Sequence, residues 1–109
     1  MSEAYEKEIQ RKGLTAARIT PERIEEVIEA EYYHIVPETQ TTICVLTLEN
    51  GFTVTGESSC ASPENFDQEL GARIARDSAK RKIWELEGYL LKQVLHDADT
   101  LGGEETTTG

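Results

Sequence analysis

Five basic residues lie within ten positions of a chain that is otherwise strongly acidic. They are Arg73, Arg76, Lys80, Arg81 and Lys82, out of eleven Lys and Arg residues in a chain of net charge −10. At about 100° per residue, Arg73, Arg76 and Lys80 fall within about 60° of one another on a helix. Because guanidinium and ammonium groups that converge in this way bind phosphate or carboxylate groups, the spacing predicts an anion-binding face.

Two alternatives remain open for the partner of these basic side chains. One is the chain itself, through ion pairs with Glu69, Asp77, Glu85 or the acidic segment from Glu22 to Glu31. The other is a small phosphorylated ligand or an acidic partner, because a guanidinium group pairs well with a phosphate. The residue types alone do not decide between them.

Three uncharged side chains complete the candidate ligand site. Asn65 has an amide that can read the edge of a base or a ribose, and Phe52 and Phe66 have rings that can stack on a base. The predicted ligand-binding residues are therefore Arg73, Arg76, Lys80, Asn65, Phe52 and Phe66. For Phe66, core packing is the alternative, because aliphatic residues follow it at helical spacing.

The chain lacks the side-chain patterns that catalysis and metal binding require. No paired carboxylates, nucleophile elbow or base with an orienting partner occur at a suitable spacing. His34 and His96 are 62 positions apart, and Cys44 and Cys60 stand singly, so no metal motif is formed. Cys44 lies in an apolar run, which predicts a buried free thiol. We expect no catalytic residue, no metal and no cofactor, and therefore a protein that is not an enzyme.

Length and charge narrow the class of protein. A chain of 109 residues has room for one domain, and its 38% apolar and 29% charged residues predict a modest core. A net charge of −10 argues against binding to a nucleic-acid polymer or an anionic membrane. No apolar run approaches the roughly 20 residues of a membrane span, and residues 1–15 are too polar for a signal peptide. We expect a cytoplasmic protein.

The N-terminal part predicts one helix and then a strand. Residues 1–13 alternate in charge and are expected to form a frayed helix or arm. Thr20 and Pro21 are typical of a helix start, and a helix of about ten residues follows, with its glutamates on a solvated face. Residues 32–36 are rich in β-prone side chains.

A β-hairpin is predicted from about residue 42 to 58. The segments 41–49 and 52–55 show strand-like alternation of side chains. Asn50 and Gly51 lie between them, and this dipeptide is typical of a type I′ turn. Together with residues 32–36, the hairpin predicts a small antiparallel sheet in an α+β fold.

One long helix, or two consecutive helices, is predicted from about residue 63 to 96. Ser62 and Pro63 mark its start, and no proline interrupts it. Its later part has an apolar face too wide for one stripe, formed by Ile83, Trp84, Leu86, Tyr89, Leu90, Leu91, Val94 and Leu95. This width predicts a break or a partner contact near residues 82–84, and a homo-oligomer built through the C-terminal helices. Residues 97–109 are expected to be a disordered tail, which leaves 1–96 as a single α+β domain.

Three motifs carry a resemblance to a known family. They are Phe52 to Ser58 (FTVTGES), Ser62 to Asp67 (SPENFD) and Ile83 to Leu91 (IWELEGYLL). In this order they resemble the bacteriophage small-protein family typed on gene forty-nine of coliphage N-four and gene sixty-six of Shigella phage Sf-six. The resemblance covers about 45 residues, Gly51 to Leu95. It implies a phage or prophage gene acting in the bacterial cytosol and does not by itself give an activity.

The layout of a small antiparallel sheet followed by two C-terminal helices also resembles that of the Thoeris anti-defence sponges. These phage proteins sequester cyclic ADP-ribose isomers and, in some cases, cyclic oligonucleotides without cleaving them. They assemble as dimers or higher oligomers and hold the ligand between subunits by aromatic stacking and arginines. The resemblance gives no residue-by-residue alignment to their binding sites.

Two functions follow as hypotheses. The leading one is a non-enzymatic counter-defence sponge for a nucleotide second messenger, with phosphates on Arg73, Arg76 and Lys80. The alternative is an acidic inhibitor that imitates a nucleic acid and occupies a basic surface of a host defence or nucleic-acid-processing protein.

Overall fold

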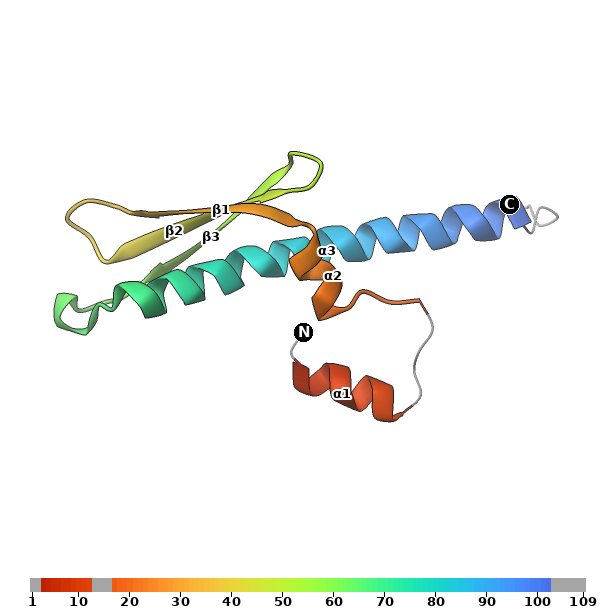
Figure 1. The fold of residues 1–109 in the computed structure, drawn as a ribbon, viewed down its shortest axis with the longest axis horizontal. Coiled ribbons are helices and arrows are strands. Elements are labelled where there is room, and N and C mark those ends of the chain that lie inside the picture. The colour runs from red at the N-terminus through yellow and green to blue at the C-terminus, as the bar shows by residue number, and fades with distance from the viewer. Residues whose placement is uncertain (1–2, 13–16, 103–109) are drawn as a thin grey trace.

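The computed structural model describes residues 3–12 and 17–102. The elements are α1 (Glu3–Arg11), α2 (Pro21–Glu26), β1 (Ile28–Ile35), β2 (Thr41–Leu48), β3 (Thr53–Ser59), the 3₁₀ helix η1 (Pro63–Asn65) and α3 (Gln68–Gly102). The three strands form one antiparallel sheet in the order β1-β2-β3. Helix α3 lies along one face of this sheet (Figure 1). The predicted α+β class is confirmed.

Helix α1 lies in the segment for which a frayed helix or arm is predicted. It occupies Glu3–Arg11 and is set apart from the sheet (Figure 1). Residues 1–2 and 13, which belong to the same predicted segment, lie outside the described residues.

The helix predicted after Thr20 starts where expected, but α2 has six residues instead of the predicted ten or so. Thr20 Oγ1 accepts a hydrogen bond from the Arg23 N–H at 3.2 Å, and Pro21 occupies the first turn. The helix ends at Glu26, and β1 begins at Ile28 instead of residue 32. The carbonyl of Val27 accepts from the Glu49 N–H at 2.9 Å, and this contact with the hairpin turns the chain into the sheet. A distant backbone contact therefore ends the helix.

The hairpin is confirmed, but its turn is not type I′. Within the described residues, φ is positive at Glu38 and Gly51 only, whereas a type I′ turn needs positive φ at both Asn50 and Gly51. The Gly51 N–H donates to the Leu48 carbonyl and the Leu48 N–H to the Phe52 carbonyl, both at 2.8 Å. This is the pattern of a three-residue loop in which a left-handed glycine forms a bulge.

The C-terminal segment is one continuous helix of 35 residues, α3, which begins at Gln68 and not at the predicted Pro63. Pro63 begins the short 3₁₀ helix η1, and the extended backbone of Phe66 separates the two helices. No break occurs near residues 82–84, so that part of the prediction is wrong. The helix also runs six residues past His96, where the disordered tail was predicted to start. Residues 97–101 contain neither glycine nor proline, and Gln93 Nε2 donates to Asp97 Oδ1 at 2.9 Å across one turn. The rest of the predicted tail, 103–109, lies outside the described residues.

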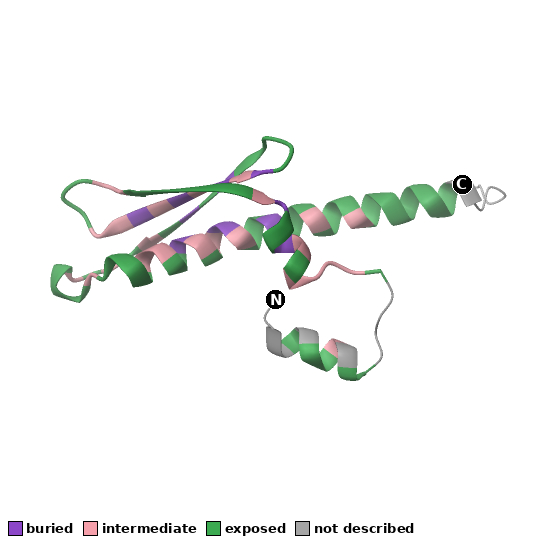
Figure 2. Cartoon of the chain, in the orientation of Figure 1, coloured by how far each residue is buried: buried purple, intermediate pink, exposed green. Residues whose placement is uncertain are grey.

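The core lies between α3 and the inner face of β2 and β3. Ala75, Ala79 and Ile83 follow one another at a spacing of four on α3 and are fully buried, with Cys44 and Leu46 of β2 among their core neighbours. Figure 2 shows this buried band in purple along the facing sides of the helix and the sheet. Cys44 is a buried free thiol, as predicted.

Candidate functional site

Arg76 of α3 is the centre of an ion-pair cluster that joins α3 to α2 and β1. Its guanidinium binds Glu25 through both terminal nitrogens, with Nη2 2.9 Å from Oε1 and Nη1 3.3 Å from Oε2. Its Nε donates to Glu31 Oε2 at 3.1 Å. Lys80 Nζ lies 2.8 Å from Glu25 Oε2. Two of the three predicted phosphate contacts are thus paired with carboxylates of the chain itself.

The cluster shifts the acid–base properties of its members. Hydrogen bonds from Arg76 and Lys80 lower the pKa of Glu25 to about 2. The hydrogen bond to Glu25 raises the pKa of Arg76. Tyr33 donates to Glu31 Oε1 at 2.7 Å, and this bond lowers the pKa of Glu31. Burial, and then the same bond, raise the pKa of Tyr33. The carboxylates are therefore ionised and the tyrosine neutral at physiological pH.

A second ion-pair group, centred on Arg23, has no counterpart in the sequence predictions. Arg23 Nη2 lies 3.0 Å from Glu49 Oε2 in the hairpin turn. Its Nε lies 3.2 Å from Glu87 Oε1 on α3, and the Glu87 side chain is only 13% exposed. These contacts tie α2 to the hairpin and to the long helix. The three residues are far apart in the chain, so no local pattern reveals them.

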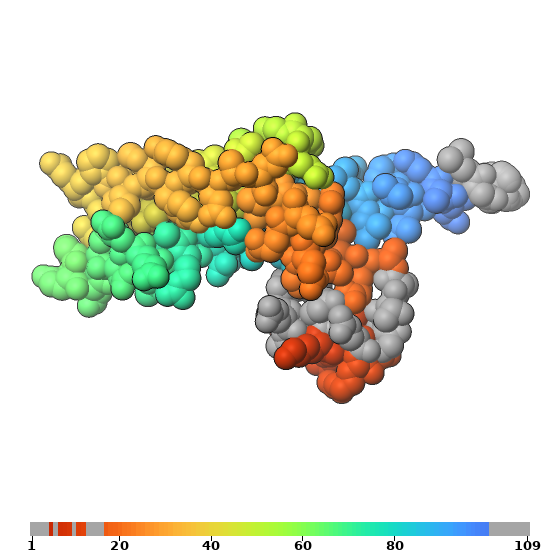
Figure 3. All heavy atoms as spheres, viewed as in Figure 1, coloured from red at the N-terminus to blue at the C-terminus, as the bar shows by residue number. Residues whose placement is uncertain are grey.

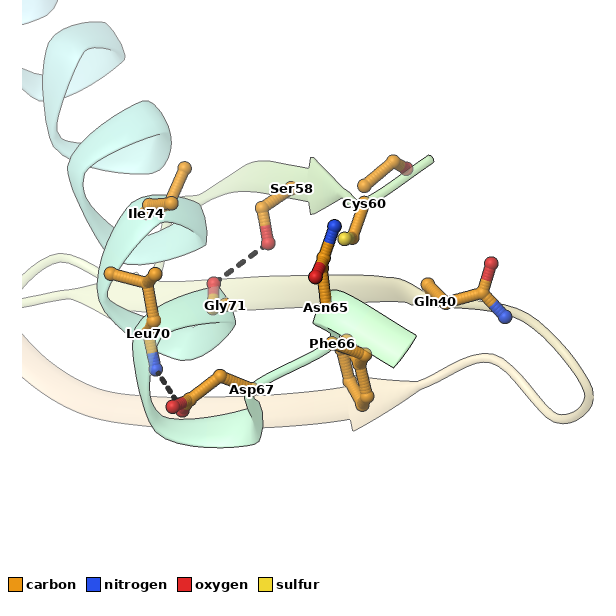
Figure 4. A pocket seen from close by; sticks show the side chains of 10 residues that line it. Gln40, Ser58, Cys60, Asn65, Phe66, Asp67, Leu70, Gly71 and Ile74 are labelled. Atoms are coloured by element: carbon orange, nitrogen blue, oxygen red, sulfur yellow. Dashed lines mark hydrogen bonds between the residues drawn. The ribbon is translucent and has the colours of Figure 1, made fainter. Parts of the chain in front are cut away.

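A hollow of about 200 Å³ lies between the end of β3, η1 and the first turns of α3 (Figure 4). Asn65 and Phe66, both predicted ligand contacts, line it together. The other lining residues are Gln40, Ser58, Ser59, Cys60, Asp67, Leu70, Gly71 and Ile74. Pockets that enclose a whole small-molecule ligand have volumes of roughly 300–1,000 Å³. This hollow therefore has room for one end of such a ligand.

Internal hydrogen bonds already engage several polar groups around the hollow. Ser58 Oγ donates to the Gly71 carbonyl at 2.8 Å, and the Leu70 N–H donates to Asp67 Oδ1 at 3.0 Å (Figure 4). The thiol of Cys60 donates to the Ser62 carbonyl at 3.2 Å. These bonds hold the wall in place and leave the Asn65 side chain, on an exposed residue, for a ligand.

Arg73 lies next to the hollow on α3. It is exposed, and it follows Leu70 by three positions, which places the two side chains as neighbours on the helix surface. It forms no ion pair with any of the described residues. Of the three predicted phosphate contacts, Arg73 is the one that is exposed and forms no ion pair with a described residue.

Phe52 lies far from the other predicted contacts. It follows the hairpin turn and is 55% exposed, whereas Asn65 and Phe66 come after the opposite end of β3. The seven residues of β3 span about 23 Å at 3.3 Å per residue. In Figure 1 the hairpin turn and η1 lie at opposite ends of the sheet. Within one chain, Phe52 therefore cannot stack on a ligand held at the hollow.

The structure also places a buried hydroxyl near the hollow that sequence reasoning missed. Thr42 is 1% exposed, and its Oγ1 has no hydrogen-bond partner among the described residues. A Cβ at Gly71 would lie 3.1 Å from this oxygen, so the glycine leaves room between the helix and Thr42. Strand alternation predicts an apolar side chain at an inward position, and a threonine there gives no separate sequence signal.

Within the described part of the chain, 3–12 and 17–102, no three or more His, Cys, Asp or Glu side chains gather in a way that could hold a metal ion. No helix in these ranges is long and apolar enough to cross a membrane.

Comparison with known proteins gives one match. No curated protein and no solved structure matches the chain significantly. One family model matches residues 19–95, which include α2, all three strands, the hollow and the greater part of α3. The matched segment is more than two thirds of the chain and contains the three motifs named above. The chain belongs to the Phage protein (N4 Gp49/phage Sf6 gene 66) family.

Proposed function

We propose that this phage protein is a non-enzymatic sponge that binds a nucleotide second messenger in the bacterial cytosol and withholds it from its receptor. The observation that carries the proposal is the hollow in which Asn65 and Phe66 lie together, with the exposed Arg73 directly before Ile74, one of its lining residues. Phe66, Leu70 and Ile74 form an apolar wall on which a base can stack, and the Asn65 amide can read its edge.

The charges around the hollow set the orientation of the ligand. Asp67 lines the hollow and caps the first turn of α3, so that end is unfavourable for a phosphate. Arg73 is an exposed cation directly before Ile74 of the lining, and guanidinium groups bind phosphate strongly. The base therefore lies in the hollow and the phosphate outside it, beside Arg73. Arg76 and Lys80, which the sequence also suggested as phosphate contacts, hold Glu25 and act as structural residues.

The test is calorimetry of the purified protein against cyclic ADP-ribose isomers, cyclic dinucleotides and cyclic trinucleotides. Binding of one member is expected, with Arg73→Ala weakening the affinity about 10- to 150-fold, the effect of one charge-assisted contact. Arg81→Ala is the matched control, because Arg81 is also exposed on α3 but follows Ile74, the last lining residue of the hollow, by seven positions. The ligand recovered after heat denaturation should be chemically unchanged, since a sponge does not turn it over.

A second candidate function, an acidic protein-binding inhibitor, is favoured by a different observation. Arg23, Arg76 and Lys80 are engaged in internal ion pairs, while carboxylates such as Glu29 and Glu57 are exposed. The net charge of −10 is therefore displayed on the surface and suits a basic host protein. If the wild-type protein binds none of the nucleotides and instead captures a basic host protein in a salt-sensitive manner, the inhibitor replaces the sponge.

A further inference from the structure

The side of α3 that packs against the sheet continues beyond the sheet as an uncovered apolar stripe. Ala79 and Ile83 are fully buried, whereas Leu86, Leu90 and Val94 are 37%, 54% and 61% exposed. At about 100° per residue, these five positions fall within about 80° of one another on the helix. Exposure therefore rises along one side of a single helix as the sheet and α2 come to an end.

The shape of the chain shows how much surface is left open. The C-terminal half of α3 extends beyond the sheet and α2 (Figures 1 and 3) and is largely exposed (Figure 2). The radius of gyration is 18.4 Å, against about 13 Å for a compact chain of this length. The accessible surface of 7718 Å² exceeds that of a compact 12.2 kDa monomer by about 1,700 Å². This excess belongs to the whole chain, α1 included, and one partner contributes about 800 Å² to a standard interface, about half of it.

We propose that this stripe, Leu86, Leu90 and Val94, binds a second copy of the chain. The half-buried Leu91 lies beside Val94 on the helix surface and widens the apolar surface. A second copy offers a free half-helix of the same length with the same apolar residues, so a two-fold axis lets the free half of each helix cover the stripe of the other. This inference concerns assembly and does not depend on the proposed ligand.

The position of the sheet decides the orientation of the pair. The sheet covers the same side of α3 one to three turns before the stripe begins, at Ala75, Ala79 and Ile83. In a parallel pair, both sheets would lie between the two helices and hold them well beyond the 8–10 Å at which helices pack. In an antiparallel pair, the two sheets lie at opposite ends, and the free halves are in contact. The second copy is therefore antiparallel, with Val94 near the two-fold axis at the middle of the free segment.

The first test measures mass in solution by light scattering and sedimentation velocity from 1 to 100 µM. The wild-type chain is expected at twice 12.2 kDa. The double variant Leu90→Glu, Val94→Glu should raise the dissociation constant at least about 100-fold, because it places four charges in the contact.

Lys92→Glu is the control. Lys92 lies on the opposite side of the helix, and its replacement changes the charge as much as the double variant does, so this variant should stay dimeric. Circular dichroism verifies that each variant is folded. A wild-type monomer at 100 µM, or a folded double variant that remains dimeric, overturns the proposal.

The second test fixes the contact by oxidative cross-linking in a Cys60→Ser background, where Cys44 is buried and unreactive. A cysteine at Val94 should cross-link to its copy, since the antiparallel pair brings these residues together. A cysteine at Leu86 should not, because its counterpart lies near residue 102 of the other chain and disulfides need Cα atoms within about 7 Å. Cross-linking at both positions indicates a parallel pair and overturns the orientation. A dimer that cross-links at neither position has its contact elsewhere, and this result overturns the proposed contact surface.

Discussion

Gly56 of β3 lies directly against the backbone of Ala79 in α3. A Cβ at Gly56 would overlap the Ala79 nitrogen and the Ala75 carbonyl oxygen. Both alanines are fully buried. Small residues on both elements therefore allow the helix to approach the strand closely, and this contact fixes the position of α3 on the sheet, including the hollow at its N-terminal end.

Replacing Gly56 by alanine should destabilise the fold by about 3 kcal/mol or more, because backbone atoms cannot move aside as a flexible side chain can. Gly88→Ala is the matched control. A Cβ at Gly88 meets no atom within 4 Å, and alanine favours the helix by up to about 1 kcal/mol. Urea unfolding of the two variants should give shifts of opposite sign. Equal midpoints would show that the close contact does not exist in solution.

Arg76 should contribute to stability through its carboxylate partners. Its side chain is 23% exposed, and Arg76→Ala leaves Glu25 and Glu31 without their shared cation. We expect a loss of about 1–2 kcal/mol, since both carboxylates remain partly solvated. Arg76→Lys should recover only part of it, because an ammonium cannot pair with Glu25 through two parallel bonds. Thermal unfolding measures both effects, and a melting temperature unchanged in Arg76→Ala would contradict the prediction.

The same cluster predicts a loss of stability in acid. The pKa of Glu25 is about 2 in the folded chain and about 4.5 as a free side chain, so folding favours its ionised form. Its contribution is present above about pH 4.5 and is lost as the pH falls toward 2. Because the side chain is 49% exposed, we expect about 1 kcal/mol. The stability lost between pH 6 and pH 3, measured by unfolding, should be smaller for Glu25→Gln than for Glu57→Gln. Glu57 is an exposed residue of the outer sheet face and serves as the control. Equal losses in the two variants would contradict the prediction.

The fold could be predicted where the signal is local. Alternating side chains and the Asn50-Gly51 pair lie within one hairpin, and they gave its position correctly. The end of α2 could not be predicted, because it depends on the contact between Val27 and Glu49, two residues 22 positions apart. The sequence left open whether the segment from 68 onward is one helix or two, because the apolar face of its later part is wide. In the structure one half of this helix packs on the sheet, and the other half leaves its apolar residues exposed.

The candidate site was predictable only in part for the same reason. Asn65 and Phe66 are neighbours in sequence and remain so in the hollow. Arg76 and Glu25 are 51 positions apart, and only the arrangement of α2 against α3 brings them together. Helical spacing predicted that Arg73, Arg76 and Lys80 converge on one anion, and in the structure only Arg76 and Lys80 of these three meet at Glu25. The spacing could not show that the anion is a carboxylate of the chain itself.

The hairpin turn provides the last prediction. Gly51 has φ of 90°, a left-handed conformation that β-branched residues resist, although the space around it is open. Gly51→Val should therefore destabilise the fold by about 1–2 kcal/mol through backbone strain alone. Gly51→Asn is the control, because asparagine adopts positive φ more readily and should cost less. Chemical unfolding should rank the chains wild type, Gly51→Asn, Gly51→Val in decreasing stability. If valine and asparagine were equally tolerated, Gly51 would not be left-handed in solution, and the bulged turn that sets the register of β2 and β3 would be wrong.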